Sequence, residues 1–566
     1  MIDITVTHPS VVNTPIAKLE RDMKSISCSK TLFFRVATLI YVLLFILTTA
    51  CSKTDTYQEG VALYDAKNYQ GAIPLFKNAI SDDPSGSNAD DAYLYLAKAE
   101  YWTNDFTSAS TDLNTLITNF PDSPLIAEAY YWKGKTLVQQ NMFSEARAAF
   151  QEVISNYSDS SLVDDSAYSI AKSYYDAADY ATAVTELNAF ITNNSSSSRL
   201  DNAQYYIAKS YHDQKMYSEA IAAFELLITT YPTSSWADNS QYQIGKVHFD
   251  SAVDANQVAV SSNLAADTTL FQTAITAFQK LITDNPGSSS ADNAQIYIGK
   301  SYQEIADITK NKSDYDAAIV AFALVNATNY PGSTSLDNAI YETGKTHYSY
   351  AGDMNAAAAA AGQPEDDKLY LPAISSFASL LADYSTSSYA DNAQLYIGKS
   401  YRGIADITLA ATDYEKAIGE FAKLNSTNYP TSTNLDNALY ETGKAYYAQG
   451  MYDQAIVEFD KVITGYPDGS SADNALYYKG HSYRRNSTPD YALARSTYAL
   501  VITNYPTSSY ADNAQYYIGY TYHLENDCVN ETTEMQKVVD TYPTSSYAST
   551  AQTHIDDIVA AAHTCI

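Results

Sequence analysis

The sequence predicts an all-α protein, a solenoid of about twelve tandem helix pairs closed by one helix at the C-terminus. Two observations predict this class. One block of residues recurs along most of the chain, and within each copy the small and apolar residues follow the three-and-four spacing of an α-helix. A Tyr-Pro pair and a Ser/Thr cluster then close the copy, as at Tyr231-Pro232, because proline cannot continue the second helix.

The residues before the first repeat have the pattern of an export signal. In chain order they are the basic residues Lys24, Lys30 and Arg35, the apolar run 36–47, the small residues 48–50 and then Cys51. A Cys directly after such a signal resembles a bacterial lipobox, in which the thiol is acylated and the peptide is cut just before the Cys. The resemblance implies a signal peptide over 1–50, and a lipidated Cys51 with a short tether over 51–55.

Two alternatives stay open at the N-terminus. Thr31–Ala50 is just long enough to span a membrane as an uncleaved signal anchor. Met23 offers a second start, which would leave 1–22 outside the protein.

The residues on either side of Cys51 differ from the usual lipobox in one place. The Leu that is usual three places before the Cys is Thr48 here. Ser52 follows the Cys; in the lipoprotein family an Asp at that place retains the protein in the inner membrane, so its absence implies the outer membrane of a Gram-negative host.

A small residue opens the first helix of each copy and serves as a marker of the repeat. These markers are Ala92, Ala129, Ser166, Ala203, Ser240, Ala294, Ala339, Ala393, Ala438, Ala475, Ala514 and Ala551. With an earlier copy aligned at Asp55, they lie 37 residues apart as far as Ser240, then 54, 45, 54 and 45 apart, and then 37, 39 and 37. The spacing predicts twelve helix pairs over 56–546 and a capping helix over 547–566.

The longer spacings reveal an internal duplication. Residues 240–338 are followed by a second stretch of equal length, 339–437, and Asp292–Thr309 matches Asp391–Thr408 at fifteen of eighteen positions. The extra residues fall between the two helices of a pair. We expect them to form longer helices or loops.

The link between pairs repeats a Ser/Thr three residues before an Asp, which predicts capping boxes at the first-helix starts. The boxes are Ser235 with Asp238, Ser289 with Asp292, Thr334 with Asp337, Ser388 with Asp391, Thr433 with Asp436, Ser470 with Asp473, and Ser509 with Asp512.

The repeat resembles the tetratricopeptide repeat. The resemblance is carried by Ile207-Ala208-x-x-Tyr211, Ala220-x-x-x-Phe224 and Pro232, although Gln204 stands where that family has Trp and the period exceeds the usual 34 residues. It implies a right-handed superhelical solenoid whose first helices line a concave groove. The long link, Tyr-Pro-Thr-Ser-Ser-x-Ala-Asp-Asn-Ala, together with the lipobox, is similar to the bacterial envelope group that contains BamD and the Tol-Pal-associated CpoB.

Charge excludes one class of partner. The chain has a formal net charge of −31, and the residues after position 50 carry 29 Lys/Arg against 62 Asp/Glu. Such a surface repels phosphate backbones and anionic headgroups. We therefore expect no nucleic-acid partner, and membrane contact only through the N-terminal lipid anchor.

No pattern of catalysis or of cofactor binding is found. Gly-Lys-Ser/Thr recurs at 134–136, 299–301, 344–346 and 398–400, but a phosphate loop needs another Gly five residues before the last one, and those positions hold Ala. The Gly is interpreted as the small residue where two helices touch. The histidines show no metal-ligand spacing, and there is no nucleophile elbow. We predict no enzyme activity, nucleotide, cofactor or metal.

A stripe of Asn, Tyr and Lys recurs on one face of the first helices, because steps of three and four residues keep to one side. The predicted groove residues are Asn202, Tyr205, Lys209, Asn239, Tyr242, Lys246, Asn293, Lys300, Asn338, Tyr341, Lys345, Asn392, Lys399, Asn437, Tyr440 and Lys444. Earlier copies continue the lysines at Lys98, Lys135 and Lys172. A Lys ladder could take an extended segment with carboxylates. Alternatively, each Lys pairs with an Asp of a neighbouring repeat, and Tyr and Asn brace the stack.

Cys528 and Cys565 are the only cysteines after Cys51. Export brings them to an oxidising compartment. Consecutive helices of such an array run antiparallel, so both thiols are expected at the same edge of the cap, and we predict a disulfide between them.

These observations lead to one leading hypothesis. The chain is predicted to be a non-catalytic, outer-membrane-anchored scaffold in the periplasm that binds envelope proteins or extended peptides along its groove. The family resemblance implies a role in envelope assembly or cell-division coordination. The alternative is a structural spacer or cell-wall-contacting protein without a specific groove ligand.

Overall fold

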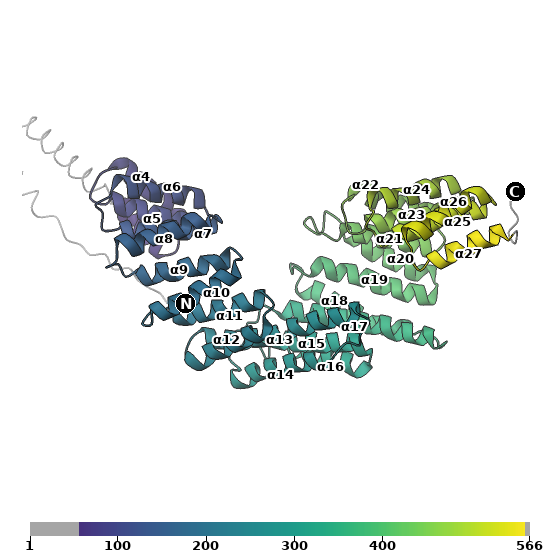
Figure 1. Cartoon of the computed structure of the whole chain (residues 1–566), viewed down its shortest axis with the longest axis horizontal. Helices are drawn as coiled ribbons and strands as arrows, with labels where there is room; N and C mark the ends of the chain where they lie inside the picture. Colours follow the sequence, from purple (N-terminus) through teal and green to yellow (C-terminus); the bar gives the residue numbers. More distant parts are fainter. Residues whose placement is uncertain (1–55, 561–566) are drawn as a thin grey trace, which may run out of the picture. The chain divides into compact units, whose positions relative to one another are not determined.

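A computed structural model describes residues 56–560 of the chain, and every regular element in that part is helical. The predicted signal peptide, the tether with Cys51, and Cys565 lie outside the described residues. The helices alternate along the chain as first and second members of pairs (Figure 1). Twelve pairs and one last helix are present between 56 and 560, so the predicted all-α repeat fold is confirmed.

The chain divides into two compact units at Ser210/Tyr211, which falls inside helix α11. The helices that begin in the first unit are α3 (Thr56–Asp65), α4 (Tyr69–Asp82), α5 (Ala89–Trp102), α6 (Phe106–Asn119), α7 (Ile126–Gln139), α8 (Phe143–Asn156), α9 (Val163–Asp176), α10 (Tyr180–Asn193) and α11 (Leu200–Asp213).

The second unit holds the remaining helices. They are α12 (Tyr217–Thr230), α13 (Trp236–Ser261), α14 (Thr269–Asp284), α15 (Ala291–Thr309), α16 (Lys312–Ala323), α17 (Leu336–Ala360), the 3₁₀ turn η2 (Asp367–Tyr370), α18 (Leu371–Asp383), α19 (Ala390–Thr408), α20 (Ala411–Lys423), α21 (Leu435–Ala448), α22 (Tyr452–Gly465), α23 (Ala472–Arg485), α24 (Tyr491–Asn504), α25 (Ala511–Leu524), α26 (Cys528–Thr541) and α27 (Ala548–Val559). Within each unit a helix packs mainly against its neighbours in sequence.

The core of each pair is a contact between a small residue on the first helix and a large one on the second. A Cβ built on Gly134, Gly344 or Gly398 would lie 2.4–2.6 Å from the ring of Phe150, Phe377 or Phe421. The glycines of the Gly-Lys-Ser/Thr sequences therefore lie where two helices touch, as their repeat positions indicate. The rings are fully buried, with 0–1% exposure.

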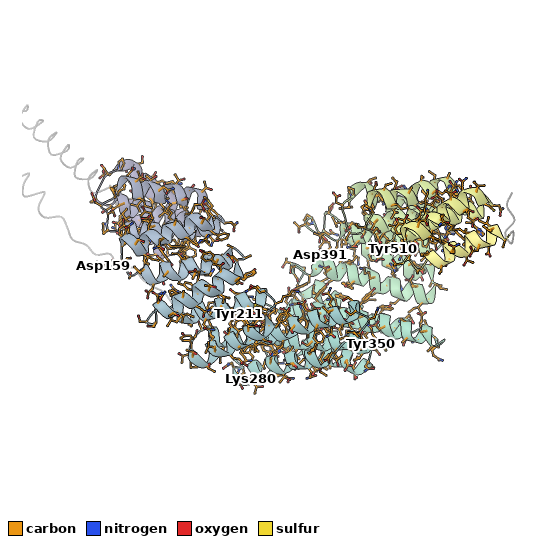
Figure 2. The ribbon with its side chains drawn as sticks, viewed as in Figure 1. Asp159, Tyr211, Lys280, Tyr350, Asp391 and Tyr510 are labelled. Carbon is orange, nitrogen blue, oxygen red and sulfur yellow. The ribbon has the colours of Figure 1, made fainter. Side chains whose placement is uncertain are left out.

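The predicted capping boxes are wrong, and the same residues make a different contact. The first-helix starts at Ser235, Ser290 and Ser335 have no side-chain cap bond. Instead, the Asp accepts a hydrogen bond from a Ser in the link that leads into the following pair. Asp391, labelled in Figure 2, accepts from Ser432 Oγ at 2.6 Å. The Ser hydroxyl also accepts the backbone N–H two residues on, so it joins two pairs.

This Ser–Asp contact recurs in both units and forms a regular connection between pairs. The donor–acceptor pairs are Ser123 to Asp90 (2.6 Å), Ser333 to Asp292 (2.5 Å), Ser387 to Asp337 (2.7 Å), Ser508 to Asp473 (2.7 Å) and Ser545 to Asp512 (2.6 Å). These aspartates therefore help to hold one repeat to the next, because hydrogen bonds to a carboxylate are stronger than neutral ones.

The inserted residues of the duplicated stretch lengthen the first helices to 26 residues in α13 and 25 in α17. The returning loop is held by one buried Asn in each copy. Asn355 Nδ2 donates to the backbone oxygen of Asp366 at 3.1 Å, and its Oδ1 accepts the N–H of Asp366 at 2.7 Å. Asn256 and Asp267, 99 residues earlier, make the same pair of bonds.

The turn inside most pairs passes through one residue with a left-handed backbone. Asn104, Asn141, Ala178 and Leu409 have φ of 54–63°. Asn tolerates this region better than other residues with a side chain, whereas Ala and Leu are strained there.

At the C-terminus, α27 packs against α26. Cys528 begins α26, is buried, and is disulfide-bonded. Its predicted partner, Cys565, is outside the described residues, so the pairing stays a prediction. Among the helices of residues 56–560, none is both long enough and apolar enough to cross a bilayer.

Candidate peptide-binding groove

The lysines of the predicted stripe lie on the first helices and are all half-buried. Most of these lysines contact the first helix of the following pair. The contacted residue lies three positions after the marker residue of that pair, as Tyr206 does after Ala203. Where that position is aromatic, the ammonium lies over the ring. Lys172 is 4.7 Å from the centroid of Tyr206, and Lys444 is 4.4 Å from that of Tyr478. Lys246 lies 5.2 Å from Tyr297.

Where that position is acidic, the Lys forms an ion pair instead. Lys300 Nζ is 3.3 Å from Glu342 and Lys399 Nζ is 3.9 Å from Glu441. Lys345 also reaches Glu342, at 3.2 Å. Burial lowers the pKa of Lys399 and lowers that of Lys444 to about 8. Lys300 and Lys399 of the second unit therefore pair with an acidic residue of the neighbouring repeat, as the alternative interpretation expects. The acidic residue is Glu, where that interpretation expected Asp.

The tyrosines of the stripe belong to the core, which corrects their assignment to a ligand surface. Tyr205, Tyr341 and Tyr440 are only 7–9% exposed, and Tyr242 is half-buried. The ring centroid of Tyr341 lies 5.9 Å from that of Phe377. The physical reason is that a first helix such as α19 packs against the second helices α18 and α20 and also contacts the first helices α17 and α21, so the face predicted to be open is partly filled.

The asparagines brace the link into the next pair. The Oδ1 of Asn293 accepts from Ser335 at 3.2 Å, that of Asn392 from Asn434 at 3.1 Å, and that of Asn437 from Ser471 at 2.7 Å. Asn202, Asn239 and Asn338 occupy the corresponding places and are half-buried. Asn293, Asn392 and Asn437 therefore hold the stack together, as the alternative interpretation expects, whereas the buried Oδ1 of Asn338 has no hydrogen-bond partner among residues 56–560.

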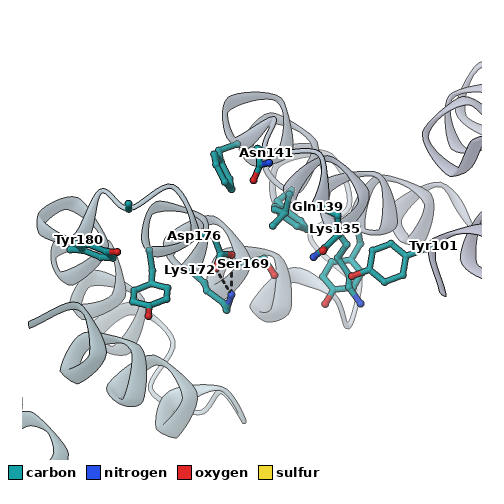
Figure 3. A pocket seen from close by; sticks show the side chains of 14 residues that line it. Tyr101, Lys135, Gln139, Asn141, Ser169, Lys172, Asp176 and Tyr180 are labelled. Carbon is teal, nitrogen blue, oxygen red and sulfur yellow. Dashed lines mark hydrogen bonds and ion pairs between the residues drawn. The ribbon is translucent and has the colours of Figure 1, made fainter. Parts of the chain in front are cut away.

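The first unit contains an open pocket of about 620 Å³ along its first helices (Figure 3). Five helices supply its wall, among them α8 with Phe143 and Phe150. Tyr101 comes from α5, Lys135 and Gln139 from α7, Ser169, Lys172 and Asp176 from α9, and Tyr180 from α10. Figure 3 shows Lys172 bound to Asp176, at 2.7 Å, whereas Lys135 lies beside the ring of Tyr101.

The ammonium of Lys135 lies among four aromatic rings. It lies 4.0 Å from the centroid of Trp132, 5.2 Å from Tyr101 and 5.8 Å from both Trp102 and Tyr131. Within residues 56–560 it forms no ion pair. Burial, followed by the nearby Arg199, lowers its pKa. The pocket thus presents a cation that is surrounded by rings and has no carboxylate partner.

The sequence analysis did not identify this pocket. Tyr101 recurs as Tyr175 and Tyr447, and Tyr180 recurs as Tyr217 and Tyr452, but none of these positions belongs to the predicted stripe of Asn, Tyr and Lys. One signal was available: the chain has three Trp, and two of them, Trp102 and Trp132, surround Lys135. Trp102 is 48% exposed, which is unusual for a residue of its size.

Comparison with protein families decides the relationship. The model of the YfiO family, described as outer membrane lipoprotein, matches residues 49–142, 133–205, 164–316 and 399–521. Together these matches cover more than half of the chain. The chain belongs to the YfiO family. Its members carry the lipoprotein description, and the matches begin two residues before Cys51 and recur along the repeats of this YfiO-family chain.

Solved structures with similar folds are distant in sequence. The C-terminal part of a TPR repeat-containing protein from Cytophaga hutchinsonii is 16% identical, with a TM-score of 0.35 over 50% of this chain and 98% of that one. A tetratricopeptide repeat protein from Parabacteroides merdae is 13% identical, with a TM-score of 0.34 over 51% and 97%. Yeast Tom70 is 13% identical, with a TM-score of 0.36 over 90% and 95%. No curated protein matches the chain.

Proposed function

We propose that this YfiO-family chain is a non-catalytic scaffold, anchored by a lipid on Cys51 to the periplasmic face of the outer membrane, that binds an extended, acidic segment of an envelope protein. The family match supports an interaction scaffold of the envelope. The observation that carries the binding role is Lys135, a cation surrounded by aromatic rings in an open pocket.

The chemistry of the pocket favours a carboxylate on an extended peptide. A carboxylate that enters the pocket replaces water on the half-buried ammonium of Lys135. A hydrogen bond between two charged groups contributes about 1.5–3 kcal/mol net of the water that it displaces. Exposed Trp and Tyr rings offer apolar area beside it. Lys300, Lys345 and Lys399 of the second unit are less suited, because they already have carboxylate partners.

The binding role is tested with pools of acidic peptides and matched pools in which Asp and Glu are replaced by Asn and Gln. Tryptophan fluorescence reports binding, since the rings of Trp102 and Trp132 lie 5.8 and 4.0 Å from Lys135 Nζ. We expect the acidic pool to bind, and Lys135→Met to weaken it by about 10- to 100-fold. Lys461→Met, on an exposed lysine of α22, is the matched control. Equal binding by Lys135→Met would exclude Lys135 as the binding residue, and no binding of the acidic pool to the wild-type chain would favour a structural spacer instead.

The anchor is tested separately. Cys51→Ser should yield an unprocessed or mislocalised precursor, without incorporation of labelled palmitate. Recovery of a correctly sized, membrane-held protein from this variant would contradict lipidation. Wild-type binding partners identified in envelope extracts would then show whether the role lies in outer-membrane assembly or in division, as the resemblance to BamD and CpoB implies.

A further inference from the structure

Three potential metal ligands converge at the C-terminal end of the second unit. His523 lies in the last turn of α25, Glu531 in the first turn of α26, and His554 on α27. Their separations in sequence, eight and 23 residues, match no metal motif. Packing of the last three helices brings one ligand atom from each to within 4.8 Å of the others.

The two imidazoles point at the same oxygen. His523 Nδ1 is 2.9 Å and His554 Nδ1 is 2.7 Å from Glu531 Oε1. The ring centroids are 4.7 Å apart and the ring planes stand at 88°. Both Nδ1 atoms are directed at one carboxylate oxygen. A metal ion that lies between the two nitrogens and this oxygen could therefore be coordinated by all three atoms.

We propose that His523, Glu531 and His554 form a binding site for a divalent transition metal of the zinc class. Two imidazole nitrogens and a carboxylate oxygen are a known ligand set for Zn²⁺ and leave a fourth position for water. Calcium and magnesium prefer oxygen ligands, so the two nitrogens disfavour them. Tetrahedral coordination needs ligand atoms about 3.3 Å apart, so the imidazoles would move away from Glu531 by roughly 0.5 Å.

The surroundings of the two histidines suit metal ligation. The hydroxyl of Tyr516 lies 3.4 Å from His554 Nε2, so it can accept a hydrogen bond from the N–H of that nitrogen when Nδ1 binds the ion. The ring of Tyr520 stacks on His523 with centroids 5.5 Å apart and an interplanar angle of 20°. Both contacts restrict ring rotation, which holds the ligands ready.

The site is also open to an ion from solvent. The Glu531 side chain is 0% exposed, whereas those of His523 and His554 are 28% and 18% exposed. The imidazoles therefore form the outer side of the site and the carboxylate its floor. A bound ion would join α25, α26 and α27, and would hold the last helix, which packs on one side only, to the pair before it.

Cobalt is a suitable probe, because Co²⁺ takes the same ligands as Zn²⁺ and has visible absorption bands that report its coordination. The full-length chain is stripped with a chelator and titrated with Co²⁺ in excess Mg²⁺, which occupies surface carboxylates. We expect one equivalent to bind with tetrahedral or five-coordinate bands that Zn²⁺ abolishes. Absence of these bands in the wild-type chain would overturn the proposal without any variant.

The variants test which residues hold the ion. His523→Gln and His554→Gln should each weaken binding by at least about 100-fold, since even an outer partner of a metal ligand contributes 10- to 100-fold. His248→Gln, on α13, is the matched control and should leave binding unchanged. Circular dichroism checks that the variants are folded. Unchanged Co²⁺ bands in the His523→Gln/His554→Gln double variant would show that the cluster is only a hydrogen-bonded cap.

Discussion

The contact between Gly398 and Phe421 offers a sharp test of how the pairs are held together. A Cβ on Gly398 would lie 2.4 Å from Phe421 Cε1 and 2.5 Å from Cδ1. Gly419, on the second helix of the same pair, is exposed and has nothing within 4 Å of such a Cβ. The same substitution, Gly to Ala, should therefore have opposite effects at the two positions.

The magnitude follows from two opposing terms. Alanine in a helix interior is favoured over glycine by about 1 kcal/mol. At Gly419 only this term acts, so Gly419→Ala should stabilise by up to about 1 kcal/mol. At Gly398 the ring must move by roughly 1 Å, and overpacking of this kind costs about 1–3 kcal/mol. We expect Gly398→Ala to destabilise by up to about 2 kcal/mol net.

Other repeats of the chain show which residue pairs this helix contact accepts. They limit the expected destabilisation by Gly398→Ala and suggest a second substitution that restores stability. Ala97 and Ala171 occupy the Gly398 position where the second helix supplies Leu113 and Leu187. Leucine lacks the ring atoms that clash, so Gly398→Ala combined with Phe421→Leu should regain most of the lost stability. Ala208 beside Phe224 shows that a pair can also accommodate alanine with phenylalanine, which is why the penalty should stay moderate.

Hydrogen exchange is the appropriate assay, because a repeat array opens locally and a single global stability is poorly defined. A loss of up to about 2 kcal/mol should speed exchange in α19 and α20 by up to about 30-fold, while α23 and α24 stay unchanged. Unaltered exchange in Gly398→Ala, or equal effects at Gly398 and Gly419, would refute the assignment of the glycine to helix contact.

Three further predictions concern charge, backbone and buried polar groups. Burial raises the pKa of Glu100, which is 1% exposed, to about 7, so its stabilising contribution is present below about pH 4.5 and is lost as pH rises through 7. Local stability of α4–α6 should fall by up to about 3 kcal/mol over that range, and Glu100→Gln should flatten the profile measured by exchange. Leu409→Gly should stabilise by about 0.5–1 kcal/mol in thermal unfolding, because its φ of 54° is strained for leucine; a loss would contradict this. Asn355→Leu should cost about 2–3 kcal/mol and expose the 361–370 loop to proteolysis, since two hydrogen bonds to Asp366 are lost; a resistant loop would contradict the clamp.

The sequence by itself determined the repeated architecture. Helical spacing and the Tyr-Pro ends predict twelve pairs and a last helix, and the described helices agree with both. The role of Gly398 also followed from sequence, because a small residue at a fixed place in every copy indicates a helix crossing. These features are local or periodic, so they can be predicted from the sequence without knowing which helices pack against each other.

Only the tertiary structure decided how residues from different pairs combine. Helical spacing shows which side of a helix a residue faces, but not which neighbouring helix covers that side. For this reason Tyr341 was predicted on a groove and lies in the core, and the Asp at each first-helix start was predicted to cap its own helix and instead binds a Ser of the next link. His523, Glu531 and His554 have no common period and come from three helices, so only the packing of those helices brings their ligand atoms together.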